Sequence, residues 1–130
     1  MRDQRGSVSV VVAAVILLAL VLSLGVADVA RVLVARSHAR TAADAAALAV
    51  AQELLLPTGI DPAEVAARYA SLNGAELSVC DCRAGTLEAT VAVTIVVDGF
   101  LLVSGTRSVS ARSRAIVDVP VGSPSPAPAV

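Results

Sequence analysis

The stretch SVSVVVAAVILLALVLSLGVA, residues 7–27, carries no charged side chain and decides the fold. At ~1.5 Å of rise per residue, a helix of this length spans about 31 Å, the thickness of the hydrocarbon core of a bilayer. Lipid offers the backbone no hydrogen-bond partner, so a segment that crosses it must be helical. Residues 7–27 therefore predict a transmembrane helix, with membrane lipid as its first partner.

A cleaved secretory signal is the alternative interpretation of the same stretch. Arg2 and Arg5 precede it, and Gly25-Val26-Ala27 has the small residues of a signal-peptidase site. The apolar region of a signal peptide, however, runs for only ~7–15 residues. Length therefore favours a retained anchor over a secreted module released after Ala27.

The orientation of the anchor rests on what flanks it. Near its ends two arginines precede the apolar stretch and three follow it, so the positive-inside rule does not decide. The lead, residues 1–6, is short enough to stay in the cytoplasm. The cysteine pair and the Pro/Ser/Ala tail at 120–130, which is predicted to be disordered, suit an exterior location. We expect a single-pass protein of the cell membrane with a cytoplasmic N-terminus and an exterior C-terminal domain.

Helical signals continue beyond the membrane. Residues 28–56 contain neither Gly nor Pro, and Pro57-Thr58-Gly59 ends the pattern. The alanine-rich part of this helix has two interpretations: it packs on its own domain, or it packs closely against partner helices, and both can hold. The candidate helix-packing residues are Ala42, Ala43, Ala46, Ala47 and Val50.

Residues 57–119 predict a small exterior α+β domain. Its short helix starts with Asp61 as N-cap and Pro62 in the first turn, and stops at Asn73-Gly74. The expected apolar face of this helix consists of Val65, Tyr69 and Leu72.

Three strands follow, because alternation of apolar and polar residues replaces the helical period. They are expected at residues 75–82, 86–97 and 108–119, with a turn at Arg83-Ala84-Gly85. In the second strand the expected inward residues are Leu87, Ala89, Val91, Val93, Ile95 and Val97, whereas Ala92 faces outward. The four apolar residues 100–103 are expected to cap the core, with contact to the bilayer or to a neighbouring protein as alternatives. The fold class is α+β: a long N-terminal transmembrane helix extended into solvent, a second short helix and a three-stranded antiparallel sheet.

Composition argues against several functions. The net charge is −1 and the basic residues, all Arg, are scattered, so no nucleic-acid partner is expected. Aromatic residues are nearly absent, which disfavours a pocket for a small-molecule substrate. Ser37, His38 and Asp44 lie on one helix, where they cannot converge as a catalytic triad. We expect no enzymatic activity, no catalytic residue, no cofactor and no metal site.

Cys80-Asp81-Cys82 is the one cysteine motif. In an extended strand both cysteines point to the same face, opposite Leu77 and Val79, at a spacing near the upper limit for a disulfide. An internal bridge, a bond between chains and two free thiols all remain open. A structural or intermolecular role is favoured over redox catalysis, because the cysteines do not lie at a helix N-terminus.

Several segments together resemble a known family. The lead at residues 5–10, the anchor, the alanine-rich stretch at 42–51 and the Asn73-Gly74-Ala75 step are similar to TadE/TadG-like proteins. These are pseudopilin-like membrane proteins of Flp (tight adherence) pilus assembly, and the Lys-free composition resembles actinobacterial versions. The resemblance implies a pilin-like shape and a non-catalytic role in pilus assembly or an associated secretion system. It implies pilus or secretion machinery as partners, and self-association through the N-terminal helix.

One position departs from the pattern of processed pilins. Gly6 and Ser7 form the candidate processing site, but Val11 stands where such pilins carry Glu. This departure counts against cleavage there and against a place in a filament core. The chain therefore resembles the TadG-like side of the family, or an anchored accessory protein, more than a major pilin. A stand-alone membrane-anchored binding or sensor domain is the alternative function.

Overall fold

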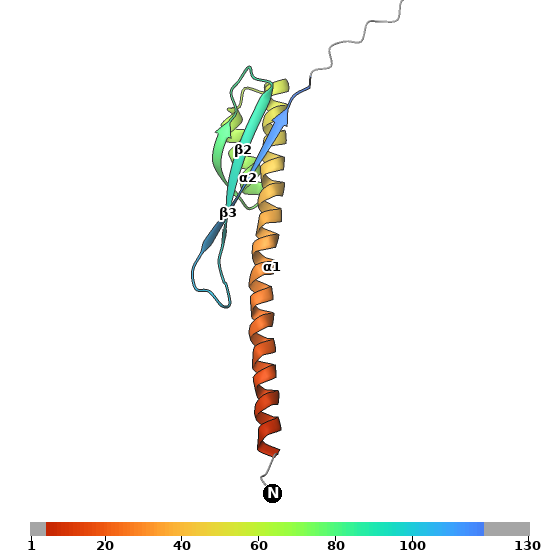
Figure 1. Cartoon of the computed structure of the whole chain (residues 1–130). Coiled ribbons are helices and arrows are strands. Elements are labelled where there is room, and N and C mark those ends of the chain that lie inside the picture. Colours follow the sequence, from red (N-terminus) through yellow and green to blue (C-terminus); the bar gives the residue numbers. More distant parts are fainter. Residues whose placement is uncertain (1–4, 119–130) are drawn as a thin grey trace, which may run out of the picture.

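The computed structural model describes residues 5–118, and this part of the chain folds into two helices and one three-stranded sheet (Figure 1). The predicted α+β fold class is confirmed. Most of the lead, the predicted tail and Val119 lie outside the described residues. The elements are α1 (Arg5–Leu55), α2 (Pro62–Leu72), β1 (Glu76–Asp81), β2 (Glu88–Val97) and β3 (Arg107–Ile116).

Helix α1 is continuous from the apolar stretch to the predicted stop. Its 51 residues correspond to about 76 Å at the usual helical rise. Beyond its last residue, Leu55, the chain is tied back to the helix by Thr58. The Glu53 carboxylate accepts hydrogen bonds from the Thr58 backbone N–H at 2.6 Å and from the Thr58 hydroxyl at 2.8 Å. These bonds lower the pKa of Glu53, the hydroxyl contributing most. They fix the turn that leads the chain back toward α2.

Helix α2 has the predicted ends. The Asp61 side chain accepts a hydrogen bond from the Ala63 N–H at 3.0 Å, as an N-cap does. At the other end Gly74 has a φ of +70°, and the Ala75 N–H donates to the Ala70 carbonyl at 3.0 Å. This is the Schellman arrangement, which favours glycine because other residues are strained at positive φ.

The predicted apolar face of α2 is wrong at two of its three residues, whereas the third, Val65, is partly buried. Ala66 and Ala70 are the residues of α2 that are fully buried, whereas Tyr69 and Leu72 are exposed. Helix α2 packs on α1, whose fully buried residues are five alanines and Val50. Two alanine faces allow a close approach, and the larger side chains of α2 lie outside the contact.

The sheet is an antiparallel meander in the order β1-β2-β3. The predicted turn is present: the Thr86 N–H donates to the Arg83 carbonyl at 3.2 Å. Strand β1 carries a bulge between Leu77 and Val79. Because the bulge shifts the alternation by one residue, Leu77 and Cys80 both pack against the core. The expectation that Leu77 faces away from the cysteines is therefore wrong.

The core lies between the second half of α1, α2 and one face of the sheet. Small residues dominate it, and Val50, Val91 and Val93 are its largest fully buried side chains. The alternation predicted for β2 fails at two places: Leu87 is exposed at the edge of the turn, and Ala92 is buried on the outer face. The core cluster consists of Ala39, Ala42, Ala43, Ala46, Ala47, Val50, Ala66, Ala70, Ala75, Ala89, Val91 and Val93.

Candidate functional site: the apolar helix segment and its junction with the sheet

The first half of α1 extends away from the rest of the molecule (Figure 1). Its large apolar side chains from Val8 to Val26 are each between 39% and 70% exposed. The helix is long and apolar enough to cross a membrane, and its most apolar stretch is not buried within residues 5–118. A core helix of a water-soluble protein passes the same test of length and composition, but it buries its apolar side chains. An N-terminal signal sequence passes it as well.

Asp28 is the first charged residue after the apolar stretch, and it joins α1 to a loop far away in the sequence. Its two carboxylate oxygens accept hydrogen bonds from the backbone N–H groups of Leu101 and Leu102, at 2.8 and 2.9 Å. The bond from Leu101 is the main cause of a lowered pKa of Asp28, followed by that from Leu102, and the nearby Arg31 contributes. Asp28 is only 9% exposed.

The loop between β2 and β3 therefore lies on α1 and not over the core. A Cβ atom added to Gly25 would lie 3.7 Å from Leu102 Cδ1, and one added to Gly99 would lie 3.5 Å from Arg31 Nη1. Figure 1 shows the loop reaching past the sheet along α1. Residues 101–103 are about half exposed, at 49–51%. The expectation that this loop caps the core is wrong, because Asp28 holds it about 16 Å along the helix axis from the first core alanine, Ala39.

The candidate helix-packing residues of α1 are all inside the chain's own core. Each is 0–1% exposed, and α1 packs there against α2, β2 and β3. In this structure they pack on their own domain, which is one of the two roles considered for the alanine-rich part of the helix. They are not exposed to a partner helix. The five residues are Ala42, Ala43, Ala46, Ala47 and Val50.

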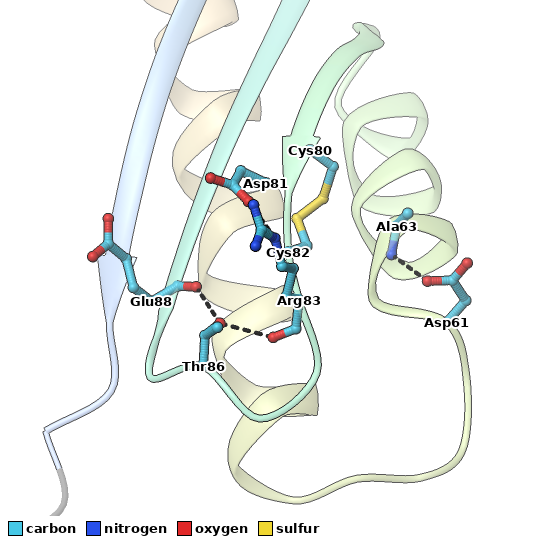
Figure 2. Close-up of a disulfide and its surroundings, with 8 residues drawn as sticks. All are labelled: Asp61, Ala63, Cys80, Asp81, Cys82, Arg83, Thr86 and Glu88. Atoms are coloured by element: carbon cyan, nitrogen blue, oxygen red, sulfur yellow. Dashed lines mark hydrogen bonds and ion pairs between the residues drawn. A yellow bond between two sulfur atoms is a disulfide. The ribbon is translucent and has the colours of Figure 1, made fainter.

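Cys80 and Cys82 are joined by a disulfide at the end of β1, with their Cα atoms 5.3 Å apart (Figure 2). Both side chains are partly buried against the core. The neighbouring turn is held by the Thr86 hydroxyl, which lies 2.7 Å from the Arg83 carbonyl and 3.0 Å from the Glu88 carbonyl. The pair thus lies where β1 leaves the sheet.

The remaining candidate residues are not assembled into a site. Ser37, His38 and Asp44 are exposed on α1. Among residues 5–118, no three His, Cys, Asp or Glu side chains are grouped so that they could hold a metal ion. Gly6 lies in the first turn of α1 and is exposed, so the backbone at the candidate processing site is helical.

Sequence reasoning missed the role of Asp28. The sequence shows that Asp28 directly follows the uncharged stretch, but its hydrogen-bond partners lie 73 and 74 residues further along the chain. A carboxylate that follows an apolar helix segment can equally well face water. Only the fold shows that it holds a loop.

A membrane-length apolar helix that continues, unbroken, into a small domain with a second short helix and a three-stranded antiparallel sheet defines the class as α+β. Within that class, residues 6–53 match a family model described as Putative Flp pilus-assembly TadE/G-like. This match covers nearly all of α1 and confirms the predicted resemblance to the TadE/TadG-like family. It supports a general role in pilus assembly. No curated protein and no solved structure matches the chain.

Proposed function

We propose that this protein is a non-catalytic, single-pass membrane component of Flp-type pilus assembly or of an associated secretion system. In this proposal residues 7–27 cross the membrane, the short lead is cytoplasmic, and residues 28–119 lie outside. The observation that carries it is the division of α1. The second half buries one face in the core, whereas the first half is apolar on all sides and exposed.

The division of α1 supports the membrane assignment on energetic grounds. Removing apolar surface from water stabilises a protein by about 25 cal/mol per Å². A helix with exposed valines and leucines on all sides gains that free energy only in a non-aqueous environment. A bilayer supplies that environment over the length of residues 7–27.

Self-association follows from what the domain leaves uncovered. The alanines of α1 that belong to the core cluster are already packed against the rest of the domain. Helix contacts between copies, or with other pilus proteins, therefore fall on the exposed side chains of α1, including residues 7–27. In lipid such contacts depend on close packing around small residues, which Ala13 and Ala14 provide.

Two pairs of matched substitutions test the anchor. Leu17 and Leu18 are 65% and 60% exposed in the apolar stretch, and Leu48 and Leu55 are 59% and 52% exposed in the second half of the same helix. Arginine at the centre of a membrane helix costs roughly 2.5–3.5 kcal/mol per residue on insertion scales. Leu17→Arg with Leu18→Arg should therefore abolish retention in carbonate-washed membranes, whereas Leu48→Arg with Leu55→Arg should leave it intact.

Equal retention of both double variants would contradict the anchor. The N-terminal residue of the mature protein separates the remaining processing routes: Met1 fits an unprocessed anchor, Ser7 fits prepilin processing, and Asp28 identifies a secreted module. The assembly role is tested in cells that lack this protein. We expect them to lose surface pili and to regain them with the wild-type chain but not with Leu17→Arg/Leu18→Arg. Normal piliation without the protein would favour a stand-alone anchored domain.

A further inference from the structure

The loop between β2 and β3 combines two properties that a solvent loop does not need. Leu101, Leu102 and Val103 follow one another and are each about half exposed. At the same time the backbone N–H groups of Leu101 and Leu102 are both bound by the Asp28 carboxylate. The loop thus presents apolar side chains outward while two of its backbone N–H groups are bound by a carboxylate of α1.

The position of the loop coincides with the end of the apolar stretch. Asp28 directly follows Ala27, the last residue of that stretch. Leu102 reaches one turn further toward the N-terminus, since its Cδ1 atom would lie 3.7 Å from a Cβ atom on Gly25. Leu102 therefore contacts α1 within the segment that we assign to the membrane.

The apolar surface of the loop is continuous with the exposed apolar surface of α1. Leu24, which lies four residues before Asp28 and therefore on the same face of α1, is 39% exposed. Arg31, whose guanidinium lies beside Gly99, is one turn further from the apolar stretch. An arginine at that level suits the phosphate layer of a bilayer, since guanidinium groups bind phosphate oxygens well.

We propose that residues 100–103 insert into the outer interface of the bilayer beside α1, as a second membrane contact. This inference rests on the proposed membrane anchor and adds a function for the loop. Contact with lipid usually leaves loop amides without partners, at a large cost. Here Asp28 supplies the partners for two of them, which allows the leucines to enter the interface. The second contact would fix the tilt and rotation of the domain on the membrane surface.

The absence of tryptophan from the sequence makes a direct test available. Single-tryptophan variants of the full chain are reconstituted in phosphatidylcholine vesicles that contain brominated phosphatidylcholine, which quenches indole emission on contact. Leu102→Trp probes the loop, and Leu101→Trp repeats the measurement at a neighbouring position. Leu17→Trp reports on the anchor. Leu87→Trp is the matched control, a leucine that is 57% exposed in the turn at the opposite end of the sheet.

We expect the brominated lipid to quench the emission of Leu17→Trp, Leu101→Trp and Leu102→Trp. The emission of Leu87→Trp should stay unchanged. For the two loop variants, bromines near the headgroup end of the acyl chain should quench more strongly than bromines near the methyl end. Quenching of Leu17→Trp alone, with both loop variants behaving like Leu87→Trp, would overturn the loop inference and leave the anchor in place. If Leu17→Trp is also unquenched, the anchor itself is refuted and the inference fails with it. A loop indole that shifts to the blue only at high protein-to-lipid ratio would identify a second copy as its partner, against the proposal.

Discussion

The contact between α1 and α2 can be tested with two neighbouring alanines. Ala66 is fully buried in the core cluster, whereas Ala67 is exposed on the same helix. Replacing either by leucine adds the same three carbon atoms. At Ala66 these atoms must enter a contact in which both helices present alanine, and overpacking of this kind costs about 1–3 kcal/mol. At Ala67 they enter solvent, and the cost stays within about 0.5 kcal/mol.

The melting temperature should report the difference. For a domain of 60–100 residues, 1 kcal/mol corresponds to roughly 4–8 °C. Ala66→Leu should therefore melt about 5–20 °C below wild type, and Ala67→Leu within a few degrees of it. Tyr69 is the one tyrosine of a chain without tryptophan, so its fluorescence follows α2 during thermal unfolding of the full chain in detergent micelles. Equal melting temperatures for both variants would refute a close alanine contact between the helices.

Further predictions concern the loop, the sheet and the cysteines. The hydrogen bonds from Leu101 and Leu102 lower the pKa of Asp28, so the stability that they add is present above the ordinary pKa of 3.8 and is lost as the pH falls through the folded-state pKa. Asp28→Ala should remove this stabilisation at neutral pH. Faster hydrogen exchange of the Leu101 and Leu102 amides would show the loss. Val91→Ala should lower the free energy of unfolding by about 1–3 kcal/mol, whereas Val96→Ala on the outer face should change it by less than about 0.5 kcal/mol; equal urea midpoints would contradict the assigned faces. Cys80 and Cys82 should be alkylated only after reduction in protein isolated from membranes, and alkylation without reductant would show that the bridge does not form there.

The elements of this fold could be predicted because their signals are local. The uncharged stretch and the Gly- and Pro-free residues 28–56 predict one long helix, and Pro57-Thr58-Gly59 and Asn73-Gly74 end the two helices where the sequence indicates. Alternation of apolar and polar residues locates the three strands, and their predicted ends differ from the observed ones by at most three residues. Caps and turns depend on neighbours along the chain, so sequence reasoning reaches them.

The arrangement of the elements could not be predicted in the same way. The buried face of α2 depends on how closely α1 approaches, and a face made of Ala66 and Ala70 has no strong apolar signal of its own. The bulge in β1 shifts the alternation between Leu77 and Val79 without a glycine to mark it. The loop at residues 100–103 looks like a core cap by composition alone. Its actual position depends on Asp28, across more than seventy residues of sequence.

Helix α1 changes its composition where its environment changes, and this offers a physical reason for its design. In water the sheet and α2 must bury their apolar faces against the helix, and alanines let them come close enough to form a dry core. In lipid no such driving force acts between apolar surfaces, so large side chains can remain uncovered. Asp28 lies at the boundary between the two regimes. With residues 7–27 in the membrane, as proposed, Asp28 would set the height of the domain above the bilayer, because its carboxylate holds the loop next to the end of the apolar stretch.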